Sequence, residues 1–220
     1  MTLATTIKDE PYRYASGQPV NNWDNKYIGS ARVRYAIEHS MNVCAVRTLT
    51  ETVGLEKGYK YLENFGFTTL VNNDPNYPGM SDIAQATALG GITRGVYNIE
   101  MTAAYAAIAN SGIYTEPLLY TEILDHDGNV LIDNSKPITR RVLKESTAFL
   151  LTSAMQDVIN RGTGTPARLN NMPAAGKTGT TETVLISGYP HIRLTTPVLY
   201  GPDMTRIKHW NNFGISHGTK

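Results

Sequence analysis

The stretch 174–181, Ala-Ala-Gly-Lys-Thr-Gly-Thr-Thr, constrains the fold and the chemistry of this chain more than any other segment. It combines small residues, one cation and three hydroxyls, and it has too little apolar bulk to form core. Its glycines let another group approach the main chain, Lys177 supplies positive charge, and the threonines supply hydroxyls and N–H groups. We therefore expect residues 174–181 to form a strand edge or a turn whose backbone a ligand can approach.

Two functional interpretations of this stretch compete with a purely structural one. Gly176-Lys177-Thr178 ends the Walker pattern of phosphate loops, but Asn171 stands where that pattern requires its first glycine, and no helix pattern follows. We reject the phosphate loop on these grounds. The second interpretation is a site in which Lys177 and backbone donors receive a carboxylate and an acyl oxyanion. Because so short a triplet also arises by chance, the stretch alone leaves a structural role open.

The composition is that of an ordinary soluble globular protein with one domain. Of the 220 residues, 41% are apolar and 18% are charged, and the net charge of +1 gives no nucleic-acid signature. The single cysteine, Cys44, excludes an internal disulfide and is expected to be a buried filler rather than a nucleophile. The histidines lack metal-ligand spacing, so no metal or other cofactor is expected. No apolar run is long enough to cross a membrane and the first residues are not a signal peptide, so we expect any export signal to lie outside this chain.

Periodicity and capping signals predict an α+β fold, with helices packed on an antiparallel sheet. A first helix is expected with Ser30 as its N-cap, interrupted at 39–42 and then continuing to Gly54. The turn residues 125–128 predict a β-hairpin between 118–124 and 129–132. The remaining helices are expected at 55–64, 82–89, 98–110 (capped by Asn98, with Met101, Ala104, Tyr105 and Ile108 inward) and 144–159 (with Phe149, Leu150, Ala154, Met155 and Val158 buried).

Several further stretches follow one another in the order and spacing of a known family. They are Ser40-Met41-Asn42, residues 88–96, residues 100–106, Arg161-Gly162-Thr163-Gly164-Thr165 and residues 176–181. From about Tyr12 to Thr181 the chain resembles the transpeptidase domain of class A penicillin-binding proteins, a family of penicillin-recognising serine enzymes. The resemblance implies the β-lactamase/transpeptidase-like α+β fold, incomplete at both ends.

The resemblance also implies a peptidoglycan D,D-transpeptidase that works without a cofactor. In that family a serine attacks the D-Ala-D-Ala end of a peptidoglycan stem peptide, forms an acyl-enzyme and passes the acyl group to an amine on a neighbouring strand. The implied partners are therefore peptidoglycan stem peptides, with β-lactams as inhibitors trapped at the acyl stage. The implied location of the full-length protein is the extracytoplasmic face of the bacterial cell membrane, although this chain carries no targeting signal.

Three motifs line the cleft of that family: Ser-x-x-Lys, Ser-x-Asn and Lys-Thr-Gly. By resemblance, Ser40 and Asn42 form the second motif. Ser40 would relay protons near Lys177 and the leaving amine, while Asn42 would bond the substrate amide and the first-motif lysine. Lys177 would shape the positive field of the site.

The third motif runs through Gly179 and supplies the binding groups that the resemblance implies. Thr178 and Thr180 would bind the substrate carboxylate, and the Thr180 N–H would complete the oxyanion hole.

The chain departs from the family pattern in lacking a nucleophile motif. None of its serines is followed by a lysine three positions later, so no Ser-x-x-Lys occurs. In the family that motif precedes Ser-x-Asn, and we expect it upstream of Met1. A site without its nucleophile keeps only binding and electrostatic effects, so we expect that this chain alone neither acylates nor transpeptidates.

Residues 182–220 are a second departure, which divides the chain into a partial transpeptidase domain at 1–181 and an anomalous tail. The tail lacks the family's Trp-x-Gly-Tyr-Asp segment and shows no apolar period. Pro190, Pro197 and Pro202 would interrupt any central strand. We therefore expect the strand at 174–181 to lack a neighbour and to expose a sheet edge.

Two alternatives to a transpeptidase domain remain open. A D,D-carboxypeptidase or β-lactamase relative of the same fold would pass the acyl group to water, although residues 88–95 and 161–165 argue against it. The chain could also be a non-catalytic binding remnant, or a gene fragment that does not fold.

A shifted reading frame accounts for the tail and gives a direct test. Reading the third base of each codon with the first two bases of the next, permitted codons from Tyr200 onward can encode Trp-Ala-Gly-Tyr-Asp-Ala-Asn-Lys. The pair Met204-Thr205 forces the aspartate of this string, and Trp210-Asn211 forces a glutamate after it. We predict that the coding DNA carries a frameshift just after Thr181. Sequencing that DNA checks this, and a stop codon or unrelated residues in the shifted frame would rule it out.

Overall fold

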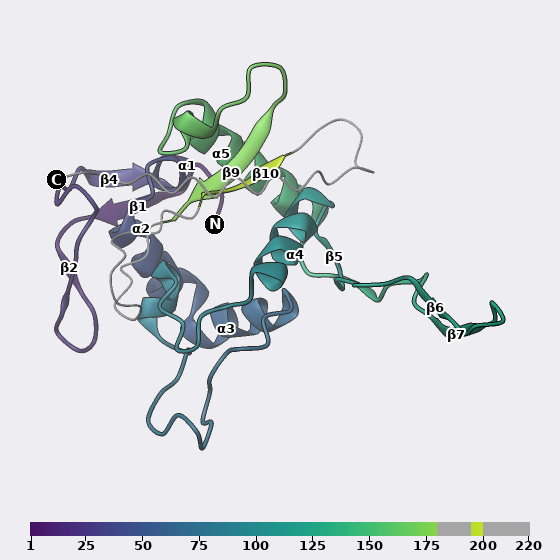
Figure 1. Cartoon of the computed structure of the whole chain (residues 1–220). Coiled ribbons are helices and arrows are strands. Elements are labelled where there is room, and N and C mark those ends of the chain that lie inside the picture. The colour runs from purple at the N-terminus through teal and green to yellow at the C-terminus, as the bar shows by residue number, and fades with distance from the viewer. Residues whose placement is uncertain (180–194, 200–220) are drawn as a thin grey trace, which may run out of the picture. The chain divides into compact units, whose positions relative to one another are not determined.

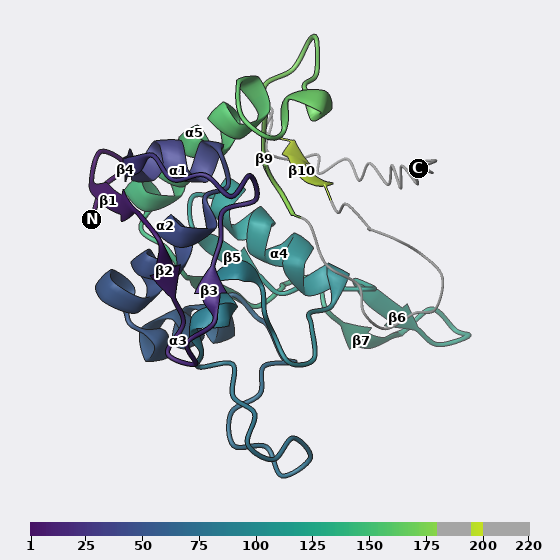
Figure 2. The same cartoon turned by 90° about the vertical axis from the view of Figure 1, so that its left-hand side faces the viewer.

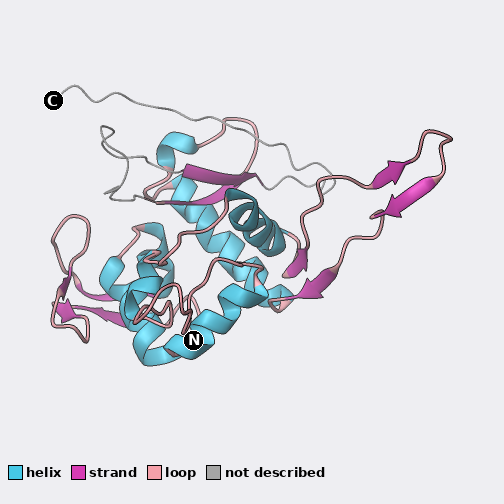
Figure 3. Ribbon diagram, turned by 60° about the horizontal axis from the view of Figure 1, so that its bottom comes forward, coloured by secondary structure: helices cyan, strands magenta, loops and turns pink. Residues whose placement is uncertain are grey.

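The computed structural model describes residues 1–179 and 195–199 (Figure 1). Within them the chain divides into two compact units. The first comprises residues 1–36 and 41–151, and the second comprises residues 37–40 together with the described residues from 152 onward. The helices of the described chain outweigh its strands, which occur as separate antiparallel pairs (Figure 3). This confirms the expected α+β class, with small ladders in place of one continuous sheet.

Two short ladders open the first unit. Strand β1 (Thr6–Asp9) pairs with β4 (Gly29–Arg32), and β2 (Tyr12–Arg13) pairs with β3 (Pro19–Val20). The prediction of Ser30 as a helix N-cap is wrong, because Ser30 lies in β4 opposite Lys8 and the helix begins only at Val33. Ala31 is buried beside Ser30, so the alternation of a strand outweighs the capping preference of serine here.

The helices that follow end largely where glycine allows a left-handed backbone. Helix α1 (Val33–Glu38) is followed by α2 (Asn42–Arg47), which continues as the π-helical segment η1 (Thr48–Val53), and Gly54 ends this run with φ = +87°. Helix α3 (Leu55–Asn64) has the predicted bounds and is followed by Gly66, also at φ = +87°.

The segment predicted as a helix over 82–89 is helical only in its second half, the 3₁₀ segment η2 (Gln85–Leu89). The reason is the buried Asp82 carboxylate. It accepts hydrogen bonds from the Val71 N–H at 2.7 Å and from the Thr93 N–H at 2.8 Å and hydroxyl at 2.7 Å. These bonds hold Asp82 to two loops and keep its own stretch out of the helix.

Helix α4 (Asn98–Ala109) confirms the expected helix but corrects its cap and its buried face. Its N-cap is Tyr97, whose N–H donates to the Glu100 carboxylate at 3.3 Å. Of the predicted inward stripe, Ala104 is buried, while Met101, Tyr105 and Ile108 are partly buried. The buried residues of α4 are Glu100, Ala103, Ala104 and Ala107.

The predicted hairpin is present and extends away from α4 (Figure 2). Strand β5 (Ile113–Thr115) pairs with β8 (Thr139–Arg141), and between them β6 (Glu122–Leu124) pairs with β7 (Val130–Asp133). The Asp125 carboxylate accepts from the N–H groups of Asp127 and Asn129, and Gly128 has φ = +85°.

Helix α2 supplies much of the core of the first unit. Val43 and Val46 pack with Val20, while Cys44 packs in a second cluster with Ala31 and Met41. Cys44 is 1% exposed, and burial raises the pKa of its thiol to about 11, so the thiol stays protonated at neutral pH. The expectation of a buried filler is confirmed.

The second unit contains the end of helix α5 (Glu145–Asn160), the 3₁₀ turn η3 (Thr165–Ala167) and the strands β9 (Ala174–Thr178) and β10 (Thr195–Leu199). In α5 the predicted burial of Ala154, Met155 and Val158 is confirmed. The predicted burial of Phe149 and Leu150 is wrong, since they are 71% and 41% exposed. Ala148, not Phe149, lies seven residues before Met155 and so shares its face.

Strand β9 has a neighbour, which corrects the expectation that it would be unpaired. It pairs antiparallel with β10, and Pro197 stands opposite Gly176. A proline is tolerated there because β10 pairs with one strand only among the described residues. The other residues of the anomalous tail, and Thr180 and Thr181, lie outside the described residues. Within the described part, no helix has both the length and the apolar content to cross a membrane.

Candidate active site

Ser40 sits in a helix-ending turn whose backbone is unusual for serine. Its N–H donates to the Ile37 carbonyl at 3.3 Å, and the next N–H, of Met41, donates to the Ala36 carbonyl at 3.0 Å. This is the bond pattern of a Schellman motif with Ser40 at the position that glycine usually fills. Ser40 has φ = +55°, a left-handed conformation that costs a non-glycine residue about 1–2 kcal/mol. The turn therefore places the Ser40 hydroxyl at a position where the stability of the fold alone would favour glycine.

Lys177 meets that hydroxyl from strand β9 in the same unit. Its ammonium donates to Ser40 Oγ at 2.7 Å and to the Thr178 carbonyl at 3.0 Å. The two side chains stand 137 positions apart in the sequence, and the structure brings them together as the resemblance implied. Burial of the ammonium lowers the pKa of Lys177 below its ordinary value, because removal from water disfavours the charged form.

This pair has the geometry of a proton relay. Since Lys177 donates to the Ser40 oxygen, the hydrogen of that hydroxyl is left to point at a third group. A lysine of lowered pKa gives up and recovers a proton more readily at neutral pH than an exposed lysine does. The arrangement can therefore pass a proton between Lys177 and a group bound beside Ser40.

Thr178 carries its hydroxyl toward a loop that sequence reasoning did not assign to the site. Its Oγ1 lies 2.6 Å from Oγ1 of Thr163, and either oxygen can be the donor. Thr163 belongs to the Arg-Gly-Thr-Gly-Thr run, which contributed to the family resemblance but gave no sign of a contact with β9. Gly179 follows β9 and is exposed. Thr180, with the predicted oxyanion N–H, lies outside the described residues.

Asn42 belongs to the first unit, where it begins α2. Its side-chain amide donates to the Asn21 carbonyl at 2.9 Å. The next residue is held in a similar way, because the Val43 N–H donates to the side chain of Asn22 at 3.2 Å and Asn22 donates in turn to the buried Asp9 carboxylate at 2.8 Å. The sequence singled out Asn42 but gave no signal for Asn22 or Asp9. The predicted bonds from Asn42 to the substrate amide and to the first-motif lysine stay a prediction.

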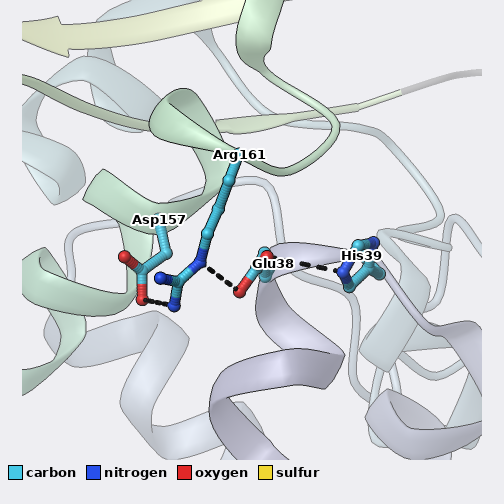
Figure 4. Close-up of polar contacts among 4 residues, drawn as sticks. All are labelled: Glu38, His39, Asp157 and Arg161. Carbon is cyan, nitrogen blue, oxygen red and sulfur yellow. Dashed lines mark hydrogen bonds and ion pairs between the residues drawn. The ribbon is translucent and has the colours of Figure 1, made fainter.

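Four charged or ionisable side chains lie beside the Ser40 turn in the second unit. Arg161 forms ion pairs with Glu38 and with Asp157, and the imidazole of His39 contacts Glu38 on the other side (Figure 4). Sequence reasoning assigned no role in the site to any of these four residues. In the described part of the chain, no group of three or more His, Cys, Asp or Glu residues could hold a metal ion.

Comparison with known proteins gives a consistent set of relatives. The family described as "Penicillin binding protein transpeptidase domain" matches residues 1–191. Penicillin-binding protein 1A of Streptococcus oralis is 37% identical over 188 residues, which cover 82% of this chain and 27% of that protein. Penicillin-binding protein 1F of Bacillus subtilis is 32% identical and covers 97% of this chain and 29% of its own length. The chain thus spans less than a third of these curated relatives.

Solved structures share the fold. The D,D-transpeptidase domain of a peptidoglycan glycosyltransferase from Eggerthella lenta has a TM-score of 0.70 at 20% identity, covering 90% of this chain and 52% of that one. The PonA1 protein from Mycobacterium tuberculosis in complex with penicillin V has a TM-score of 0.67 at 22% identity, covering 82% and 48%. The arrangement of helices and short strands is therefore that of a transpeptidase domain.

Replacing Ser40 separates its backbone strain from its hydroxyl contact. Both Ser40→Gly and Ser40→Ala lose the bond to Lys177, but only glycine relieves the left-handed conformation. We predict that the glycine variant is more stable than the alanine variant by about 1 kcal/mol in urea unfolding. Ser30, in an extended strand, is the matched control, where glycine should be the less stable of the two replacements. Equal stability of the two Ser40 variants would contradict the strain.

The lowered pKa of Lys177 predicts a pH dependence of stability. Below its folded-state pKa the fold carries the full cost of burying an ammonium. Between that pKa and the ordinary lysine value, the unfolded chain binds more protons, so the free energy of unfolding rises with pH. We expect this rise in urea titrations of the wild-type chain on the alkaline side of neutrality, and its loss in Lys177→Met. A Lys177→Met variant with the same pH slope as the wild type would show that another group causes it.

Proposed function

The chain belongs to the family of penicillin-binding protein transpeptidase domains, and from that premise we propose that its site recognises the D-Ala-D-Ala end of peptidoglycan stem peptides and the β-lactams that resemble it. The observation that carries this proposal is the 2.7 Å contact between Lys177 and Ser40. This hydrogen bond joins Ser40 of the Ser-x-Asn motif to Lys177 of the Lys-Thr-Gly motif, which lie 137 positions apart in the sequence. The same family membership supports action at the extracytoplasmic face of the bacterial cell membrane.

Lys177 and Thr178 are suited to receive the terminal carboxylate of such a peptide. Lys177 brings a positive charge in surroundings with little water, where its attraction for an anion is stronger than at an exposed surface. Of the two hydroxyls of Thr163 and Thr178, only one can donate to the other, so the second hydrogen is available to a carboxylate oxygen. The Thr180 hydroxyl and N–H would complete this half of the site.

Ser40 is suited to the proton transfers of the reaction. Cleavage of the D-Ala-D-Ala amide requires a proton on the departing amine nitrogen, and the later attack by an acceptor amine requires its removal. Ser40 can give and take this proton, and Lys177 can replenish it through the bond that it already makes to Ser40 Oγ. Asn42 would hold the substrate amide while this occurs.

The acyl-enzyme needs a nucleophile that these 220 residues do not supply as a Ser-x-x-Lys motif. We therefore propose that this chain binds and orients the peptide end but does not acylate or transpeptidate alone. A D,D-carboxypeptidase or β-lactamase relative is the runner-up, and the family described as "Penicillin binding protein transpeptidase domain", which matches residues 1–191, favours the transpeptidase. A binding remnant or an unfolded gene fragment stays open, and the binding measurement below separates them.

The frameshift after Thr181 also stays a proposal. The family match ends at residue 191 of 220, which supports a departure in the tail. The alignment with penicillin-binding protein 1F, however, extends over 97% of the chain. The coding DNA decides between the two.

Two measurements on the purified chain test the function. We expect no covalent band with a fluorescent penicillin on a denaturing gel, because the nucleophile motif is absent. We expect reversible binding of a peptide ending in D-Ala-D-Ala, measured by NMR shift titration, and about tenfold weaker binding in Lys177→Ala, since a hydrogen bond to a charged group contributes about 1.5–3 kcal/mol.

Lys136→Ala, on the exposed hairpin segment, is the control and should bind like the wild type. A covalent penicillin band would overturn the missing nucleophile. A Lys177→Ala variant that binds the peptide as well as the wild type would overturn the proposed recognition.

A further inference from the structure

Glu38 is a buried carboxylate two residues before Ser40. Its side chain is 9% exposed, and one of its oxygens accepts a bond from Arg161 Nε at 3.1 Å. The other oxygen lies 3.4 Å from Nε2 of His39, a contact that becomes an ion pair when the histidine is protonated. A carboxylate this deeply buried is stable only when it is paired, so its partners are tightly specified.

Arg161 is held on both sides (Figure 4). Its Nε donates to Glu38, and its terminal nitrogen donates at 2.9 Å to Asp157, one turn earlier on α5. The contact with Glu38, followed by the charge of Asp157, raises the pKa of Arg161 further, so it stays a cation throughout. A planar guanidinium that bridges two carboxylates fixes direction as well as distance. The end of α5 is thereby tied to the turn that carries Ser40.

The loop after Arg161 continues this connection toward β9. The Thr163 N–H donates to the Glu38 carbonyl at 3.2 Å, and the Thr163 hydroxyl contacts that of Thr178 at 2.6 Å. Gly162 packs so closely on Glu38 that an added Cβ would overlap the Glu38 carbonyl and lie 2.9 Å from Glu38 Cγ. The loop 161–164 thus contacts the Glu38 backbone directly on one side and β9 on the other.

We propose that Glu38, clamped by Arg161, is a positioning residue that sets the contact between Ser40 and Lys177. This inference rests on the proposed function in taking Ser40 and Lys177 as the reacting pair. The contacts close a ring: Glu38 to Thr163, Thr163 to Thr178, the adjacent Lys177 to Ser40, and Ser40 back through the turn to Glu38. Because the ring is closed, a movement of Glu38 must change another contact in it. Among these contacts the Ser40–Lys177 hydrogen bond joins the residues farthest apart in the sequence, 137 positions.

The charge of Glu38 acts on this ring only through its pairing with Arg161 and does not contact substrate. Ser40 holds a strained backbone and Lys177 a buried ammonium, so both would relax if the turn could move. Loss of the Glu38–Arg161 pair would let the turn relax and let water reach Lys177. The relay would then lose its alignment although every group in it is still present.

The test reads the titration of Lys177 and does not depend on any ligand. NMR of the chain with labelled lysine side chains, with Lys177 assigned through Lys177→Arg, gives its pKa in each variant. Glu38→Ala and Arg161→Leu should each raise the pKa of Lys177 toward that of an exposed lysine. Glu38→Gln keeps an acceptor for Arg161 and should retain most of the wild-type value. The control is Glu51→Ala, which removes the ion pair of Glu51 with Arg47, also 3.1 Å long, in the first unit.

The outcomes separate positioning from stability and from function. A folded Glu38→Ala chain whose Lys177 titrates as in the wild type would show that Glu38 contributes to stability alone and would overturn the proposal. If Glu38→Ala does not fold, the double replacement Glu38→Gln with Arg161→Leu decides by the same criterion, because it leaves no unpaired charge at position 38, where the side chain is 9% exposed. If the wild type fails to bind the D-Ala-D-Ala peptide while Glu38→Ala still shifts Lys177, the proposed function falls and the positioning role stands.

Discussion

The hydrogen bond from Lys177 to Ser40 is the contact on which the rest of the second unit depends. Each partner is costly to the fold, since one is a serine in a left-handed conformation and the other is an ammonium removed from water. Both costs are offset by the surroundings: the backbone bonds of the turn, the buried Ala174 and Ala175 of β9, and the ion pairs of Glu38.

The elements that could be predicted from the sequence are those set by local chemistry. Helix α3 has its predicted bounds because glycines with positive φ flank it, and the hairpin at 125–128 forms because its turn residues bond to one another. The errors have local causes too. Serine is a common N-cap residue, but Ser30 lies in strand β4. In α4 the small side chains of Ala103 and Ala107 are buried, and the predicted apolar stripe did not include them.

The residues that sequence reasoning missed are buried polar groups whose partners are distant. Asp82 gathers bonds from two loops, Asn22 joins Asp9 to the start of α2, and Glu38 meets Arg161 across 123 positions. A window of neighbouring residues contains no trace of such pairings, because a buried carboxylate and an exposed one look alike in the sequence. The candidate site could be proposed because Ser40-Met41-Asn42 and Lys177-Thr178-Gly179 are short sequence motifs, whereas the buried polar contacts that hold these motifs in place form no motif.

The left-handed backbone at Ser40 bears on the history of the chain as well as on its chemistry. Folding by itself rewards glycine at this position, so random substitution followed by selection for stability would remove the serine. Ser40 therefore stands where a glycine would serve the fold better, which points to selection for its hydroxyl and not for stability.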